Sequence, residues 1–477
     1  MPAVKPRGRR WSAEKLAAVL AAVVMVASLV VACQAKTQDS GSAASAAPLP
    51  LKTSASPAPV ATFDQRRSDW LAERLRSLVD QQRFADVVDV RTGVPPTAVP
   101  NVDAALVELD AAGRPVAAAN TLLDDEHPHG VAVPVGADLA ATGVRWTHWS
   151  NTLWAERATG SPGFAGAANG PIEFMAPYPA SVFKLMVAFG VVRLVDRGSV
   201  RLEADYGYEP GPSGCPAGLA SGRHPVSWWL DSMITYSDNH SACAMLHLLH
   251  DRGAVDSLNA TFRWLGLSTL RIVDTSSDGG GWSFDGLTMT GLDTARLLLL
   301  FTDAPGTLWR TPTGTPVTSA LLTGSSRAVI RGLLAQQGLN QALSRANWCG
   351  QTYPPVGIPQ RVAQRWVDPA TGAVSVHGRA FGGDIRPCNA SAEVEFAHKT
   401  GLVPSAGADV GVVTALPGAP PRRYVVAVFS NLGCTLVDSA APTDGTCRYT
   451  GKLATLGAGI DALMTYAAAR STAHLVG

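Results

Sequence analysis

The sequence predicts an α/β (α+β) fold in which helices flank one antiparallel sheet and a helical subdomain is inserted between its strands. Three observations lead to this prediction. A helical stripe and a hairpin pattern occupy residues 68–119, apolar helical segments fill the middle of the chain, and strand patterns return after residue 407. Because strand patterns at both ends enclose the helical ones, the sheet must combine distant parts of the chain.

The first elements follow from their apolar spacing. Residues 68–82 place Trp70, Leu71 and Leu75 on one stripe, which predicts a helix. Residues 104–119 predict a hairpin whose two strand patterns meet across an Ala-Ala-Gly turn. Residues 121–172 are rich in Gly, Pro and Trp and show little periodicity, so we interpret them as a long insertion without an assigned role.

The later elements are predicted in the same way. Residues 181–197 are nearly all apolar between Pro179 and Gly198, which predicts a buried central helix. Further helices are expected over residues 228–236, 241–250, 292–302 and 453–469, and paired strands over residues 408–415 and 424–430.

The composition allows a large core and argues against nucleic acid as a partner. The 477 residues could form two or three domains or one large domain with appendages. Charged residues make up 16% and hydrophobic residues 46%, and the formal net charge is +1. Nucleic-acid binding normally requires a basic field, which this balance does not provide.

The N-terminus has the pattern of an export signal. Basic residues precede an apolar run over residues 16–32, which ends in Val30-Val-Ala-Cys33. This ending resembles a bacterial lipobox, in which Cys33 becomes the lipidated, palmitate-bearing first residue and anchors the protein to the outer face of the cell membrane. The alternative is a signal anchor that stays in the membrane. Residues 34–62 are rich in Ala, Ser and Pro and predict a disordered tether, followed by one domain over residues 63–477.

The remaining cysteines predict disulfides. Without Cys33 six are left, an even number that suits an oxidising compartment. Sequence proximity favours the pairs 215–243, 349–388 and 434–447. Zinc is the competing interpretation, but no C-x-x-C pair occurs and the histidines lack ligand spacing. We therefore expect neither a metal nor a cofactor.

Three short fragments carry the functional prediction. They are Ser181-Val-Phe-Lys184, Ser237-Asp-Asn239 and Lys399-Thr-Gly401, in this order. Each is weak alone, because Ser12 and Lys15 also form S-x-x-K, and Ser257-Leu-Asn259 repeats S-x-N. A Ser and a Lys three residues apart at a helix start share one face. The helix N-terminus favours negative charge, and burial lowers the pKa of a lysine, which allows Lys184 to act as a base towards Ser181.

The order and context of these fragments resemble the penicillin-recognising serine hydrolases, and the class A β-lactamases most closely. The resemblance implies that Ser181 is the nucleophile, Lys184 its base and Ser237 a proton relay, while Asn239 holds Lys184 and the substrate. It implies that Lys399, Thr400 and Gly401 bind the substrate, and that the backbone amides of Ser181 and Leu402 form the oxyanion hole. Asp238 is expected to hold the turn through backbone hydrogen bonds, and capping alone is the simpler role of this trio.

The chain also departs from this family. Leu402 stands where relatives usually have a hydroxyl residue, and no glutamate occurs between residues 240 and 392 to activate the deacylating water. Asp274 or Asp278 are the possible substitutes. His398 is a possible spare base, although a packing role is the simpler interpretation. The distance between the second and third fragments is longer than usual, which predicts a second insertion over residues 348–395.

These observations predict a monomeric envelope serine hydrolase, acylated on Ser181 by a β-lactam or a peptidoglycan-type amide or ester and then hydrolysed. Fold and motif do not fix the substrate, so alternatives stay open. One is a penicillin-binding or peptidase-like protein without turnover, and another an esterase or amidase acting on envelope material. A third is a catalytically silent lipoprotein that binds wall peptide or a protein partner, with the insertions covering the site.

Overall fold

The computed structural model describes residues 63–473, except 159–162, 165–169, 212–213, 339–341, 351–355, 377–378, 440–446 and 448. The predicted signal peptide, Cys33 and the tether over residues 34–62 lie outside the described residues. Among the residues that are described, no helix is both long enough and apolar enough to cross a membrane.

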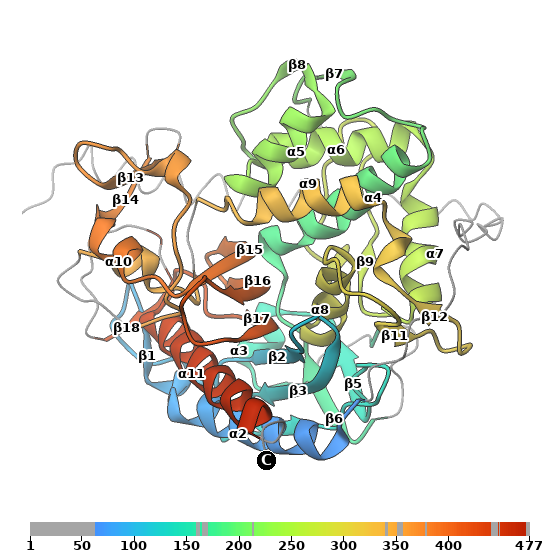
Figure 1. Cartoon of the computed structure of the whole chain (residues 1–477). Helices are drawn as coiled ribbons and strands as arrows, with labels where there is room; N and C mark the ends of the chain where they lie inside the picture. The colour runs from blue at the N-terminus through green and yellow to red at the C-terminus, as the bar shows by residue number, and fades with distance from the viewer. Residues whose placement is uncertain are drawn as a thin grey trace, which may run out of the picture. The chain divides into compact units, whose positions relative to one another are not determined.

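A six-stranded antiparallel sheet in the order β15-β16-β17-β2-β3-β4 forms the centre of the domain (Figure 1). Its strands are β2 (Val102–Leu109), β3 (Pro115–Leu123), β4 (Val131–Val133), β15 (Val394–Val403), β16 (Ala406–Ala415) and β17 (Arg423–Ser430). In the register of β17 with β2, Tyr424 lies opposite Glu108, so strands from the two ends of the chain are direct neighbours. The predicted sheet and hairpin are confirmed.

Two helices from opposite ends of the chain cover one face of this sheet. They are α2 (Gln65–Gln81) and α11 (Gly451–Ala473), which lie side by side in Figure 1. Both confirm predicted helices. A buried ion pair fixes α11 to the sheet, because Arg422 is fully buried and donates to Asp461 at 2.8 Å, and the Tyr424 hydroxyl donates to the same carboxylate at 2.9 Å.

The helical subdomain packs against the other face and holds the larger apolar cluster. Its helices are α4 (Lys184–Asp196), α5 (Val226–Thr235), α6 (Asn239–Asp251), α7 (Val255–Leu265), α8 (Gly291–Leu300) and α9 (Gly324–Leu334). Asp103 of β2 links the two parts, since its buried carboxylate accepts the Gly291 amide of α8 at 2.6 Å. The segment predicted as a helix from Ser181 differs at its start. Residues Ala180–Phe183 form a 3-10 turn (η2), and the α-helix begins at Lys184. Ala180 has a φ of 45°, outside the right-handed helical region.

The first predicted insertion is partly a piece of the main sheet. Strand β3 continues to Leu123 and β4 pairs with it, so residues 121–123 and 131–133 belong to the sheet. The rest contains a parallel pair, β5 (Val144–Thr147) and β6 (Ile172–Met175), and the short helix α3 (Asn151–Ala155). Sequence periodicity missed these strands because they are only four residues long.

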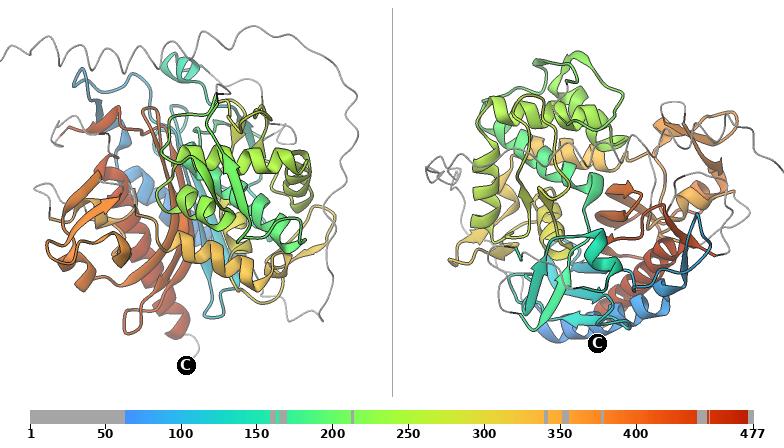
Figure 2. Two further views of the ribbon diagram at one scale, coloured as in Figure 1. Left: turned by 90° about the horizontal axis from the view of Figure 1, so that it is seen from above. Right: turned by 180° about the vertical axis from the view of Figure 1, so that it is seen from behind.

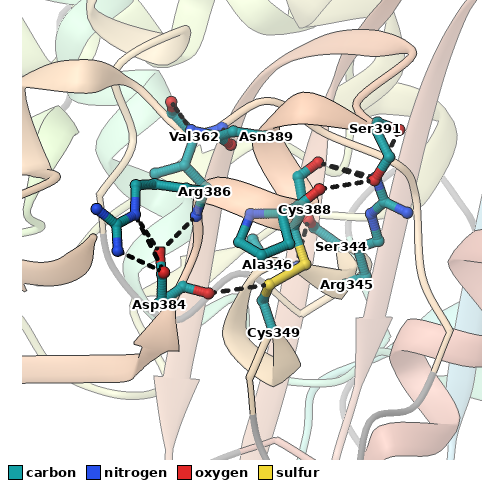
Figure 3. Close-up of a disulfide and its surroundings, with 11 residues drawn as sticks. Ser344, Arg345, Ala346, Cys349, Val362, Asp384, Arg386, Cys388, Asn389 and Ser391 are labelled. Atoms are coloured by element: carbon teal, nitrogen blue, oxygen red, sulfur yellow. Dashed lines mark hydrogen bonds and ion pairs between the residues drawn. A yellow bond between two sulfur atoms is a disulfide. The ribbon is translucent and has the colours of Figure 1, made fainter. Parts of the chain in front are cut away.

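The segment between α9 and β15, which includes most of the second predicted insertion (residues 348–395), has its own small apolar cluster. It contains η4 (Arg345–Trp348), η5 (Gln364–Trp366), β13 (Ala373–Val376), β14 (Arg379–Asp384) and α10 (Arg386–Ala390). Figure 3 shows its disulfide between Cys349 and Cys388. All three predicted pairs are formed, the others being Cys215–Cys243 and Cys434–Cys447.

Short peripheral elements complete the described chain. They are η1 (Phe84–Asp86), η3 (Ser319–Leu321) and the two-stranded pairs β1 (Val87–Asp89) with β18 (Leu436–Asp438), β7 (Asp205–Tyr208) with β8 (Gly222–Pro225), β9 (Arg271–Ile272) with β10 (Leu287–Thr288), and β11 (Trp309–Arg310) with β12 (Pro316–Val317). Figure 2 shows the helical subdomain and the sheet from two further directions.

Candidate active site

The three sequence fragments meet where the helical subdomain joins the sheet. Ser181 lies in the turn η2 and Lys184 is the first residue of α4. Ser237 lies in the turn between α5 and α6, and Asn239 is the first residue of α6. The third fragment, Lys399-Thr-Gly401, lies in β15, which is an edge strand of the sheet as the sequence analysis expected.

The amine of Lys184 is the centre of the site. Its Nζ atom lies 3.1 Å from Ser181 Oγ, 3.2 Å from Ser237 Oγ and 2.9 Å from Asn239 Oδ1, and it donates to the Ser237 carbonyl at 2.5 Å. The side chain is fully buried. Burial lowers the pKa of Lys184 to about 7, and the nearby carboxylate of Asp238 only partly opposes this. A large fraction of the amine is therefore neutral near pH 7 and can accept the proton of Ser181.

The hydroxyl of Ser237 connects two buried amines. Lys399 Nζ donates to Ser237 Oγ at 3.0 Å and also to the Thr400 carbonyl at 2.9 Å. Burial, and then repulsion by Lys184, holds the pKa of Lys399 well below its usual range. Ser237 has a φ of 64°, a left-handed conformation that is uncommon for residues other than glycine and typical of functional turns.

The turn that carries Ser237 and Asn239 is fixed by local contacts. Asp238 caps α6 by accepting the Ser241 amide at 2.7 Å and also accepts the Leu219 amide at 2.5 Å. Asn239 Nδ2 donates to the Ala217 carbonyl at 3.0 Å, which leaves Oδ1 directed at Lys184. One turn thus both caps α6 and positions Ser237 and Asn239. No signal in the sequence indicated the contact of Asn239 with Ala217.

Gly401 brings the edge strand against the backbone of the nucleophile. A Cβ atom at this position would lie 2.7 Å from the Pro179 carbonyl oxygen and 3.1 Å from the Ser181 amide nitrogen, so a side chain has no room. Leu402 is the next residue. The two amides expected to form an oxyanion hole, those of Ser181 and Leu402, therefore belong to segments in direct contact.

His398 has a packing role. It is fully buried, its Nδ1 atom lies 2.7 Å from Asp409 Oδ1, and its Nε2 atom lies 3.1 Å from Gln360 Nε2. The ring also stacks on Phe396 at a centroid distance of 4.2 Å. Both ring nitrogens have partners remote from Ser181, so His398 is not placed to act as a second base.

Neither candidate for the deacylating carboxylate reaches the site. Asp274 and Asp278 are exposed on the loop between β9 and β10, and within the described residues neither carboxylate contacts Ser181, Lys184 or Ser237. The same loop instead places Trp282 against Phe183 at a ring distance of 4.6 Å. An indole therefore packs beneath the nucleophile turn, which sequence reasoning also missed. No group of three His, Cys, Asp or Glu side chains suited to a metal ion occurs in the described part of the chain.

A model of the Beta-lactamase enzyme family, Beta-lactamase2, matches residues 176–345. The match covers roughly a third of the chain and includes Ser181, Lys184, Ser237 and Asn239, but it ends before Lys399. The described domain has a serine β-lactamase-like fold. Together with the geometry of the site, the match supports a β-lactamase-like serine hydrolase.

Similar solved structures include PBP-A, with 16% sequence identity, coverage of 81% of this chain and 94% of that chain, and a TM-score of 0.42. A β-lactamase from Streptosporangium roseum is 14% identical, with 83% and 99% coverage and a TM-score of 0.42. The ancestral class A β-lactamase GNCA is 16% identical, with 83% and 99% coverage and a TM-score of 0.40. No curated protein matches the chain. Similarity at this level says nothing about the substrate of this chain.

Proposed function

We propose that this chain is a cell-envelope serine hydrolase that is acylated on Ser181 by a β-lactam or by a related amide or ester of the peptidoglycan type. One observation carries the proposal. The buried Lys184 amine, with a pKa lowered to about 7, lies within hydrogen-bond distance of the hydroxyls of both Ser181 and Ser237. A base between two hydroxyls is the arrangement that acyl transfer requires, because one proton must leave the nucleophile and another must reach the leaving group.

Acylation follows from these contacts. Ser181 Oγ attacks the substrate carbonyl carbon while its proton passes to neutral Lys184. The Ser181 and Leu402 amides stabilise the negative charge on the carbonyl oxygen. Ser237 then gives its proton to the leaving nitrogen or oxygen as the bond to the carbonyl carbon breaks, and Lys184 returns a proton to Ser237. Lys399 and Thr400 hold an acidic group of the substrate, although the lowered pKa of Lys399 weakens the attraction.

Deacylation is expected to be slow. Asp274 and Asp278 are exposed on the β9–β10 loop, so the attacking water depends on Lys184 as its base. The acyl-enzyme therefore accumulates and is hydrolysed slowly, which places the protein between a β-lactamase and a penicillin-binding protein in its behaviour towards β-lactams. The N-terminal pattern supports anchoring of the monomer to the outer face of the membrane through lipidated Cys33.

Mass spectrometry of the intact protein after exposure to a penicillin tests the proposal. We expect the mass of one ring-opened penicillin on the wild type, lasting for minutes or longer, and no adduct on Ser181→Ala. Ser257→Ala is a matched control, because Ser257 stands in the second S-x-N pattern on α7 and its hydroxyl donates to the Ala254 carbonyl. Equal labelling of the wild type and Ser181→Ala would refute acylation at Ser181.

A further inference from the structure

Residues 214–220, which we call the Cys215 segment, lie against the first turn of α6. The Cys215–Cys243 disulfide joins this segment to α6 one helical turn beyond Asn239. The Cys215 Sγ atom lies 3.9 Å from the Asn239 carbonyl oxygen. The segment is therefore attached covalently beside a residue whose side chain contacts the amine of Lys184.

Side chains at the start of α6 hold the backbone of the Cys215 segment. Three hydrogen bonds each join one backbone group of the segment to one side chain: Ala217 to Asn239 at 3.0 Å, Leu219 to Asp238 at 2.5 Å, and Ala220 to His240 at 3.0 Å. Gly218 fits closely between them, because a Cβ atom there would lie 2.4 Å from the His240 amide nitrogen. The segment thus contacts the turn that carries Ser237 and Asn239 along its whole length.

The disulfide is the strongest of these links. Residues 214–220 form no backbone–backbone hydrogen bond with any other residue that the structure describes. Ala217 and Leu219 are exposed, so water competes for their hydrogen bonds, and an exposed bond of this kind adds little to stability. The position of the Cys215 segment on Asn239 therefore depends mainly on the Cys215–Cys243 disulfide.

The contact with Ala217 decides which end of the Asn239 amide faces Lys184. One end is an NH2 donor and the other an oxygen acceptor. Since the Ala217 carbonyl accepts from Nδ2, the Oδ1 atom faces Lys184 Nζ at 2.9 Å. Without the Cys215 segment, the side chain is free to turn its NH2 group towards the amine, which then loses an acceptor.

The orientation of Asn239 in turn determines what the Lys184 amine can do. A neutral lysine amine has two N–H bonds and one lone pair. The Ser237 carbonyl, at 2.5 Å, and Asn239 Oδ1 accept the two N–H groups. The lone pair is then left for the hydroxyl protons of Ser181 and Ser237. If Asn239 no longer accepts, the freed N–H can donate to Ser181 Oγ, and the amine is a donor to the nucleophile instead of its base.

We propose that the Cys215–Cys243 disulfide controls the acylation of Ser181, because it holds the Cys215 segment on Asn239 and so leaves the lone pair of Lys184 for the nucleophile. Cys215 and Cys243 are positioning residues in this role. The inference rests on the proposed acylation of Ser181 and adds a dependence on thiol oxidation. When a disulfide oxidant joins the two thiols, the S–S bond forms, and the oxidant takes up two electrons and two protons and becomes a dithiol. Ser181 gains its reactivity with this step.

Two matched double variants test this role. Changing Cys215 and Cys243 to Ala removes the disulfide without placing a hydroxyl in the core, where Cys243 is fully buried. Changing Cys349 and Cys388 to Ala is the control, because that disulfide joins η4 to α10 in the segment before β15 (Figure 3). The paired cysteines are 28 and 39 residues apart, so the loss of either disulfide should destabilise the folded chain to a similar degree.

Gly218→Ala is a second variant, which keeps the disulfide. A Cβ atom there would lie 2.4 Å from the His240 amide nitrogen, so the Cys215 segment must move away from α6. Gly332→Ala is its control, because Gly332 is exposed on α9 and a Cβ atom there meets nothing within 4 Å.

The readout is the single-turnover acylation rate of the folded full-length chain with a chromogenic cephalosporin at pH 8. Loss of the Cys215–Cys243 disulfide should slow acylation about tenfold or more, as should Asn239→Ala. Loss of the Cys349–Cys388 disulfide should leave the rate within about twofold of the wild type. Gly218→Ala should slow acylation about threefold or more, and Gly332→Ala should not change the rate.

A double-mutant cycle shows whether the disulfide acts through Asn239. Adding Asn239→Ala to the chain without the Cys215–Cys243 disulfide should slow acylation by less than about threefold more, because both changes remove the same contact with Lys184. Adding Asn239→Ala to the chain without the Cys349–Cys388 disulfide should have its full effect. A disulfide that only stabilises the fold would give losses that multiply in both cases.

The results separate this inference from the proposed function. An unchanged rate without the Cys215–Cys243 disulfide, or a loss that multiplies with that of Asn239→Ala, overturns the role of the disulfide. If that double variant does not fold, Gly218→Ala and Gly332→Ala decide, and equal rates in the two overturn it. A wild type that forms no adduct overturns acylation itself, which the mass of the penicillin-treated protein reports independently.

Discussion

The pH dependence of acylation is the most direct test of the role given to Lys184. Burial lowers the pKa of this amine to about 7, and only the neutral form can accept the proton of Ser181. The neutral fraction is about one tenth at pH 6 and about nine tenths at pH 8 for a group with this pKa. The acylation rate should therefore rise roughly tenfold between these pH values and level off above pH 8.

Stopped-flow or quenched-flow acylation with a chromogenic cephalosporin measures this profile under single-turnover conditions. Lys184→Arg is expected to lose acylation across the whole range, because a guanidinium does not give up its proton. The titratable groups that face Lys184 are Asp238 and Lys399, and Lys399 shares the Ser237 hydroxyl with it.

A control variant tests whether the buried imidazole of His398, rather than Lys184, is the base. His398 pairs with Asp409 and Gln360, away from Ser181, so His398→Gln should leave the midpoint of the profile within half a pH unit. A rate that is flat between pH 6 and pH 8, or a midpoint that moves with His398→Gln, would show that another group is the base.

Two further predictions concern the stability of the domain. Burial raises the pKa of Asp103 from its ordinary value of 3.8 to about 6, so the folded state binds more protons than the unfolded state between these values and loses stability as the pH rises through them. At pH 7 the ionised Asp103 lowers the free energy of unfolding by about 3 kcal/mol. Urea denaturation of the wild type and Asp103→Asn should therefore show the stability of the variant rising relative to the wild type by up to that amount between pH 4 and pH 7. A difference in stability that does not vary with pH would contradict this. Arg422→Met leaves the Asp461 carboxylate without its fully buried partner and should lower the free energy of unfolding by about 3–5 kcal/mol. Arg310→Met, on the exposed hairpin β11–β12, should change it by less than about 0.5 kcal/mol, and comparable losses in the two variants would rule out a structural role for the buried pair.

Local patterns in the sequence predicted most of the fold because its main elements are long. The apolar stripe on α2 and the apolar run of α4 each persist over ten or more residues, which is long enough to define a helical period. The small parallel pair β5–β6 was missed because four residues do not define a period. The 3-10 turn before Lys184 was missed because its first residue, Ala180, has a positive φ that is uncommon for alanine and leaves no mark in the sequence.

The site was predictable as a set of residue types, and less so as a set of contacts. Spacing placed Ser181 and Lys184 on one face, and the order of the fragments placed Ser237 and Lys399 beside them. The contacts of Trp366 with Tyr236 and of Gln360 with His398 join segments 38 or more residues apart with no shared motif. Such pairings arise from packing alone, and a single sequence contains no local pattern that reports them.

The pairing of β17 with β2 has a consequence for when the amine of Lys184 acquires its properties during folding. Lys184 is translated more than two hundred residues before the strands β15–β17 that wall off the site from water. Until those strands pair with β2, the amine lacks the burial that lowers its pKa, and the serine beside it lacks a neutral base. Reactivity is thus switched on by completion of the chain, so that a truncated or half-made polypeptide carries the motif without the chemistry.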